Sequence, residues 1–165
     1  MSTDMRVPAI DVIVEAPAWE ALQAEATVRR ALAEAVAAIG GDFKNHALAV
    51  LLTDDAAIRR LNAQWRGIDK PTNVLSFPPG PQLAEEGAKS LGDIAIAHET
   101  TAREARDEGK PFDHHLSHLA VHGFLHLLGY DHESNAQAEA MEQLERAILA
   151  RLGVPDPYLT QEIGV

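Results

Sequence analysis

Four short segments of the chain carry the apolar patterns of β-strands. Residues 9–15 (AIDVIVE) alternate between apolar and polar side chains, and residues 46–53 (HALAVLLT) are mostly apolar, as in an interior strand. Residues 72–77 (TNVLSF) and 91–97 (LGDIAIA) complete the set. A helical stretch separates the first two strands, which favours a right-handed parallel crossover. The proline-rich segment between the last two, residues 78–90, has no helical pattern, so we expect these strands to be antiparallel and the segment to be mobile.

Helical patterns fill most of the remaining chain. The predicted helices cover residues 19–39, 54 or 55 to about 65, 100 or 101 to 109, 112–128 and 134–152. The fourth of them is apolar on nearly every side, which is typical of a buried helix. The patterns together predict one α+β domain spanning residues 1–165, with a mixed sheet of about four strands packed with about five helices.

The composition is that of an ordinary globular protein, with 46% hydrophobic and 24% charged residues. The chain has no run of about 18 apolar residues that would predict a membrane span. The N-terminal residues also lack the pattern of a signal peptide. Cysteine is absent, so disulfides and thiolate ligands are excluded and any metal must be bound by histidine or carboxylate. We therefore expect a cytoplasmic protein without a membrane partner.

The formal net charge of −11 argues against general nucleic-acid binding, because a polyanion requires local positive potential. The basic residues are nevertheless concentrated, since Arg59, Arg60, Arg66 and Lys70 all lie within one short segment. Glutamates in turn crowd the C-terminal helix. Two interpretations stay open: a solvated helix face followed by an acidic helix, or a local groove for RNA on an acidic protein.

Three histidines at the end of the apolar helix form the clearest candidate site. His122 and His126 are four residues apart, just over one helical turn, so they share a face. Gly129 stands where a helix commonly ends with a left-handed residue, after which the chain can bring His132 towards the other two. Three neutral imidazoles leave the fourth position of a tetrahedral zinc ion open, as in catalytic sites. The alternative is a set of hydrogen-bonded core histidines.

His118 lies one turn before His122 and is the competing ligand. Ligands at His118, His122 and His126 on one straight helix would spread over about 12 Å, too far for one ion, so we expect His118 to lie outside the ligand set. The other histidines have no comparable spacing and are expected in surface or loop positions: His46, His98, His114 and His115. Gly123 stands where the H-E-x-x-H metalloproteases carry a glutamate. Close packing on a strand and room for a substrate explain this glycine equally well.

Three blocks of sequence occur in a defined order. RGIDKPTNVLSFP covers residues 66–78, LGDIAI covers residues 91–96 and HGFLHLLGYDH covers residues 122–132. In these blocks the chain resembles the YbeY family of bacterial endoribonucleases, over most of the domain. The N-terminal third adds only compatible secondary structure. Phe124 and the proline-rich segment depart from the family pattern, and neither affects the three histidines.

The resemblance implies a zinc-dependent, single-strand-specific endoribonuclease. Such an enzyme would act in 3′-end maturation of small-subunit (16S) ribosomal RNA and in ribosome quality control. The resemblance also implies a zincin-like core with one Zn²⁺ per chain, bound by His122, His126 and His132, and Arg66 and His122 as catalytic residues. The partners would be single-stranded RNA, precursor ribosomal RNA, and the small ribosomal subunit with its proteins.

Arg66 also suits phosphate chemistry on physical grounds, because a guanidinium is always charged and its fork matches phosphate geometry. Two other functions stay open at the level of sequence. One is a zinc metalloprotease-like hydrolase, in which a remote carboxylate such as Asp131 would serve as the base. The other is a non-catalytic ribosome-assembly factor that binds RNA or protein and uses zinc only structurally.

Overall fold

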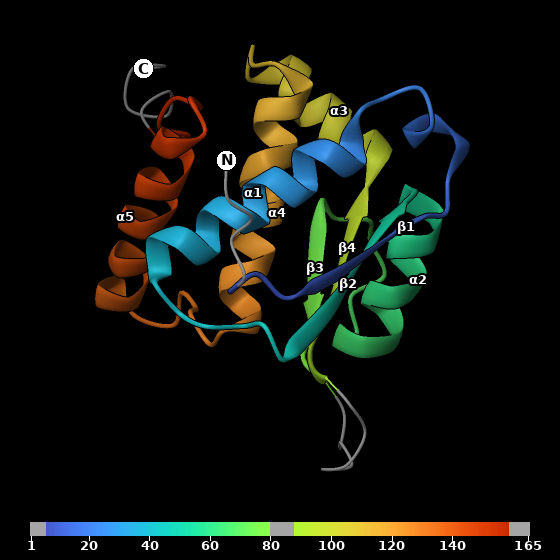
Figure 1. Cartoon of the computed structure of the whole chain (residues 1–165). Coiled ribbons are helices and arrows are strands. Elements are labelled where there is room, and N and C mark those ends of the chain that lie inside the picture. The colour runs from blue at the N-terminus through green and yellow to red at the C-terminus, as the bar shows by residue number, and fades with distance from the viewer. Residues whose placement is uncertain (1–5, 80–87, 159–165) are drawn as a thin grey trace.

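The computed structural model of the chain describes residues 6–79 and 88–158 (Figure 1). Its mixed sheet consists of β1 (Ala9–Val14), β2 (His46–Thr53), β3 (Val74–Phe77) and β4 (Lys89–Ala97), in the spatial order β1-β2-β4-β3. The β1–β2 and β2–β4 pairs are parallel, and β3 and β4 are antiparallel. The predicted α+β class is therefore confirmed, together with the direction of both predicted strand pairs. Of the segment expected to be mobile, residues 80–87 lie outside the described residues.

Every predicted helix is present. The helices are α1 (Ala24–Ile39), α2 (Asp55–Arg66), α3 (His98–Asp107), α4 (Phe112–Leu127) and α5 (Asn135–Arg151). Side chains cap two of them, because Asp54 accepts a hydrogen bond from the Ala57 N–H (2.8 Å) and Ser134 and Gln137 form a reciprocal capping box. Within the described ranges, no helix combines the length and apolar character needed to cross a membrane.

The predicted start of α1 at Trp19 is wrong. Residues Pro17–Trp19 form a separate 3₁₀ turn, and α1 begins only at Ala24. The turn places the Trp19 ring in the core, where its Nε1–H donates to the Thr53 carbonyl at 2.8 Å. Helix α3 also departs from the prediction, because it begins a little earlier, at His98.

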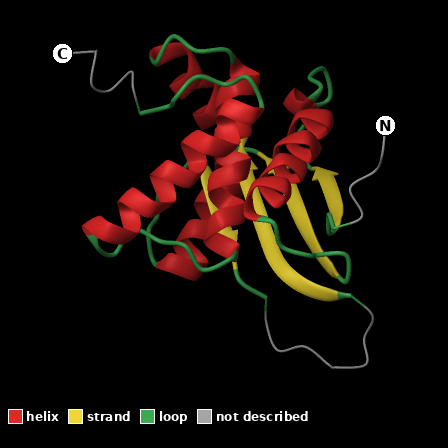
Figure 2. Ribbon diagram, turned by 60° about the vertical axis from the view of Figure 1, so that its left-hand side comes forward, coloured by secondary structure: helices red, strands yellow, loops and turns green. Residues whose placement is uncertain are grey.

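The helices cover both faces of the sheet (Figures 1 and 2). Helices α1, α4 and α5 enclose the larger core on one face. Helix α2 covers the other face, where Ile58 packs against Leu75, Ala95 and Ala97. Helix α4 contacts α1, α3, α5 and two strands, so it is buried on nearly every side, as its apolar sequence predicts.

Gly123 marks a close approach of α4 to the sheet. A Cβ atom at this position would lie 2.9 Å from Ile94 Cγ2, 3.2 Å from Ser76 Oγ and 3.3 Å from Val74 Cγ2. The Ser76 hydroxyl donates to the Gly123 carbonyl (2.9 Å) across the same contact. Close packing of helix on strand, one of the two explanations that the sequence left open, therefore accounts for this glycine.

We expect Gly123→Ala to lower the free energy of unfolding by about 1 kcal/mol, because overpacking a core typically costs about 1–3 kcal/mol and outweighs the roughly 1 kcal/mol that alanine gains in helix propensity. Chemical denaturation measures the difference. In an Ile94→Ala background, which removes the nearest methyl group, the same substitution should cost less. A stability equal to or above that of the wild type would rule out close packing as the reason for Gly123.

Candidate metal centre and active site

One large cavity brings the candidate residues together. It has a volume of about 840 Å³, and its walls come from the end of α2, strand β3, helix α4 and the segment at Pro157 and Tyr158. The histidines of the predicted ligand set line it, together with Arg66 and His118. Residues that are distant in sequence, and that the sequence singles out for separate reasons, therefore share one cleft.

The end of α4 explains how His132 reaches the other two histidines. Gly129 adopts a left-handed φ of 102°, and its N–H donates to the His126 carbonyl (3.0 Å). The Tyr130 N–H reaches further back, to the Leu125 carbonyl (3.1 Å). This pair of hydrogen bonds is a Schellman motif, which reverses the chain direction after the helix. The predicted turn at Gly129 is confirmed.

The three histidines have a spacing that is compatible with one tetrahedral ion. One ring nitrogen from each of His122, His126 and His132 lies within 4.8 Å of the other two. The Nε2 atoms of His122 and His126 are 3.1 Å apart, and two nitrogens bound at about 2.0–2.1 Å to one tetrahedral ion would be about 3.3 Å apart. The ring centroid of His132 lies 5.1 Å from that of His122 and 4.9 Å from that of His126.

A buried glutamate on α5 holds one of these histidines. The Glu145 carboxylate accepts hydrogen bonds from His122 Nδ1 (2.8 Å), His118 Nε2 (3.1 Å) and the Tyr158 hydroxyl (2.5 Å). Glu145 belongs to the acidic C-terminal helix that the sequence predicts, but unlike the more exposed glutamates of that helix it is fully buried. The signal that could have identified it is its position one turn after Met141, in the buried stripe of the helix.

Burial and the neighbouring groups together determine the charge states in this network. Burial alone would raise the pKa of Glu145, but the hydrogen bonds from His118 and His122 outweigh it and hold the pKa at about 2. Burial, followed by the adjacent carboxylate, raises the pKa of Tyr158, so its hydroxyl stays protonated and donates. Burial and the two adjacent histidine rings lower the pKa of His126. A neutral His126 keeps a nitrogen lone pair available to a metal ion.

The three histidines could bind a metal ion. Because His122 Nδ1 donates its proton to Glu145, its Nε2 carries the lone pair and lies beside His126. A second group, His118 with His122 and Glu145, is equally compact. In that group His118 Nε2 and His122 Nδ1 both donate hydrogen bonds to the Glu145 carboxylate, so these two nitrogens carry protons and offer no lone pair to a metal. We therefore favour the cluster of His122, His126 and His132, with His118 outside it.

Arg66 differs from the other basic residues of its segment. It is the last residue of α2, where Gly67 ends the helix with a left-handed φ of 70°, and its side chain lines the histidine cavity. Arg59 instead pairs with Asp69 (2.7 Å), and Arg59 and Arg60 line a separate hollow. A solvated face thus describes Arg59 and Arg60, whereas Arg66 lies in the candidate site.

Comparison with known proteins identifies the family of this chain. The model of the family described as Endoribonuclease YbeY matches residues 14–153. The chain belongs to the YbeY family. An Endoribonuclease YbeY of Rhodopseudomonas palustris (strain BisA53) is 62% identical over 159 residues, which cover 94% of this chain and 92% of that protein. The resemblance seen in the three sequence blocks is therefore confirmed.

Other YbeY proteins and a solved structure show the same relationship. An Endoribonuclease YbeY of Nitrobacter winogradskyi is 59% identical over 160 residues, covering 94% of this chain and 84% of that protein. The solution structure of TM1509 from Thermotoga maritima superposes with a TM-score of 0.55 at 27% identity, covering 87% of this chain and 91% of that chain. The similarity therefore extends from sequence to fold.

A second pair of carboxylate and histidine lines the cavity, formed by buried His115 and partly exposed Glu104. His115 Nε2 lies 2.8 Å from Glu104 Oε1, which also accepts a hydrogen bond from Asn73 Nδ2 (2.9 Å). Burial alone would raise the pKa of Glu104, but the hydrogen bonds from His115 and Asn73 lower it. The expectation of a surface or loop position is wrong for His115, which is buried on α4. Its partner, Glu104, lies on α3. The spacing of histidines in the sequence cannot reveal a partner on another helix.

Removing the Glu145 carboxylate should destabilise the fold strongly. We expect Glu145→Ala to lower the free energy of unfolding by about 3–5 kcal/mol, because it leaves His118, His122 and Tyr158 without their acceptor. Urea denaturation measures the loss. The control is Glu142→Ala on the same helix, whose partly exposed side chain should contribute less than about 0.5 kcal/mol. Equal effects of the two substitutions would contradict a stabilising role for the network.

The same carboxylate defines a pH window. Its pKa in the folded protein, about 2, lies below the ordinary value of 4.5. The stability that it contributes is therefore complete above about pH 4.5 and is lost as the pH falls towards 2. The difference in unfolding free energy between the wild type and Glu145→Gln should shrink over this range. A difference that stays constant down to pH 2 would show that the charge of Glu145 is not responsible.

Proposed function

We propose that this protein is a zinc-dependent endoribonuclease that cleaves single-stranded RNA, with His122, His126 and His132 as ligands of one zinc ion per chain. The observation that carries this proposal is that three histidine nitrogens and Arg66 line one cavity, in a chain whose family is described as endoribonucleases. Membership of that family supports hydrolysis of RNA phosphodiester bonds. The choice of zinc is supported by the donor set, because three neutral imidazoles with an open position suit this ion.

Each residue of the proposed site has a defined task. Arg66 would contact the non-bridging oxygens of the scissile phosphate, since its planar guanidinium can donate two parallel hydrogen bonds and is always charged. Glu145 would hold the His122 ring in one tautomer and one orientation. His122 would thus act in catalysis through its place in the ligand set. When bound, zinc supplies Lewis acidity near neutral pH for phosphate and water.

The position of the site in a cleft supports a single-stranded substrate. An unpaired strand can splay its backbone into a cleft more easily than an A-form duplex can. The family further suggests 3′-end maturation of 16S ribosomal RNA and ribosome quality control as the biological role. Precursor ribosomal RNA and the small ribosomal subunit with its proteins would then be the partners, and the site of action would be cytoplasmic.

The two alternative functions account for fewer observations. A metalloprotease requires a general base, and Gly123 offers no side chain at the usual position. Asp131, the remote candidate, accepts a hydrogen bond from the Glu133 N–H (2.9 Å) within its own turn. An assembly factor with structural zinc would give no reason for Arg66 to line the same cavity as the histidines.

Metal analysis tests the ligand set. The purified protein should contain about one zinc per chain, and substitution of His122, His126 or His132 by alanine should lower the occupancy strongly. His118→Ala should lower it little, because that ring lies outside the favoured cluster. Elemental analysis of the four variants measures the effect. Loss of zinc in His118→Ala with retention in His132→Ala would move the metal to the group of His118, His122 and Glu145.

RNA cleavage tests the proposed activity and the role of Arg66. The wild type should cut single-stranded RNA and spare a duplex of the same sequence. Arg66→Lys keeps the charge but loses the two-pronged geometry, and it should lower kcat by about 10²–10³ with zinc content and Tm unchanged. Arg60→Ala, on the neighbouring hollow, is the matched control and should cleave at nearly the wild-type rate.

A His126→Ala variant should be inactive. Any RNA cleavage by a preparation of this variant, purified in parallel, would therefore reveal a contaminating ribonuclease. Duplex cleavage as fast as single-strand cleavage would contradict the substrate proposal. Full activity of Arg66→Lys would remove the two-pronged phosphate contact from the mechanism, and loss of zinc in that variant would make Arg66 a structural residue.

A further inference from the structure

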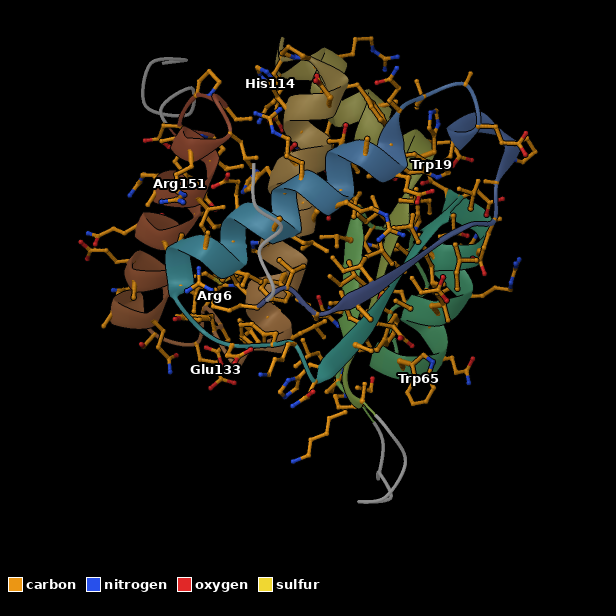
Figure 3. The ribbon with its side chains drawn as sticks, in the orientation of Figure 1. Arg6, Trp19, Trp65, His114, Glu133 and Arg151 are labelled. Atoms are coloured by element: carbon orange, nitrogen blue, oxygen red, sulfur yellow. The ribbon has the colours of Figure 1, made fainter. Side chains whose placement is uncertain are left out.

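Trp65 is exposed beside the histidine cavity. It retains 65% of its accessible surface, whereas Trp19, the other tryptophan of the chain, retains 1%. Trp19 donates a hydrogen bond to Thr53, the last residue of β2. Trp65 lies in the last turn of α2, at the other end of the sheet (Figure 3). Tryptophan is largely buried in most proteins, and an exposed ring beside a cavity is typical of a binding surface.

The Trp65 ring packs against an aromatic ring of strand β3. The Phe77 ring on β3 lies 6.2 Å away between centroids, in an edge-to-face contact at 63°. Phe77 itself packs against the smaller core, beside Leu75. A single edge-to-face contact leaves at least one face of the indole uncovered by Phe77. The ring is therefore held in position and can still accept a flat ligand.

We propose that Trp65 stacks on an unpaired nucleobase of the RNA strand whose phosphate Arg66 contacts. The two residues are consecutive at the end of α2, and both line the cavity that holds the histidines. Every nucleotide presents a flat base next to an anionic phosphate, so an aromatic ring beside a guanidinium matches the strand without requiring a particular sequence. This inference rests on the proposed function and adds to it the contact that selects unpaired bases.

The surroundings of Trp65 favour a base over a protein partner. Ile68 is the exposed apolar side chain nearest to it in sequence, with 43% of its surface accessible, and it lies outside the lining of the cavity. Among the described lining residues the exposed apolar side chains are Trp65 and Pro78, so the cavity presents one flat ring beside an arginine and a single proline. Protein-binding surfaces more often present a contiguous apolar patch.

Binding of a 2′-O-methyl RNA oligonucleotide, with a labelled end, tests the stacking contact. Bound bases should quench the fluorescence of Trp65 in the wild type, and Trp65→Phe, in which only buried Trp19 remains, should show no quenching. Trp65→Ala should bind about 5- to 100-fold more weakly by fluorescence anisotropy, while Trp65→Phe, which keeps an aromatic ring, should stay near wild type. Ile68→Ala is the matched control and should bind like the wild type.

Abasic oligonucleotides separate stacking from a structural effect. If Trp65 contacts a base, wild type and Trp65→Ala should bind an abasic strand equally, and Trp65→Ala should raise the KM for RNA while kcat, zinc content and Tm stay near wild type.

Unchanged RNA binding by Trp65→Ala would overturn the proposal. So would a defect that persists on the abasic strand, or one confined to association with small ribosomal subunits, which would assign Trp65 to a protein surface. A wild type that binds the oligonucleotide with quenching but cleaves no RNA would refute the proposed function and leave the stacking contact standing.

Discussion

Helix α4 is enclosed by protein on nearly every side, and a buried polar side chain is costly unless it finds a hydrogen-bond partner. Three of the elements around the helix supply such partners. Helix α3 supplies Glu104 to His115, and α5 supplies Glu145 to His118 and His122. Strand β3 supplies the Ser76 hydroxyl to the backbone of the helix. These hydrogen bonds link α4 to α3, α5 and β3, and residues of α3, α4 and β3 line the cavity.

The Glu145 network shows how a structural requirement can also prepare a site for chemistry. A buried carboxylate is tolerated only with good hydrogen-bond donors, and Glu145 has two imidazoles and a phenol. The hydrogen bond to Glu145 occupies His122 Nδ1 as a donor. The Nε2 atom of the same ring then lies beside His126 with its lone pair available. The His122 ring is therefore oriented by a protein contact before any metal binds. A ligand set that is oriented in advance binds a metal with a smaller loss of side-chain entropy.

Local patterns in the sequence predict most of the fold and part of the site. Strands and helices follow from periodicity, and Gly129 predicts the turn that brings His132 to His126, because these signals are confined to a few neighbouring residues. Trp19 was misplaced in a helix because its burial depends on Thr53, in a different strand. The burial of Glu145 and His115 does not follow from local sequence for the same reason, since their partners lie on other helices. Gly123 could be interpreted only once Ile94 was seen opposite it.

The net charge of −11 does not describe what the cavity presents to a ligand. Glu145 is enclosed by its donors and Glu104 is bonded to His115, while the charge of Arg59 is matched by Asp69. Arg66 lines the histidine cavity, and Lys110, which also lines it, is paired with Glu108. Among the described residues that line the cavity, Arg66 is the one cationic side chain without a carboxylate partner. A small number of side-chain contacts to phosphate gives a weak dependence of RNA binding on salt. Contacts that salt does not screen can add to the affinity, and the exposed Trp65 ring next to Arg66 would provide one.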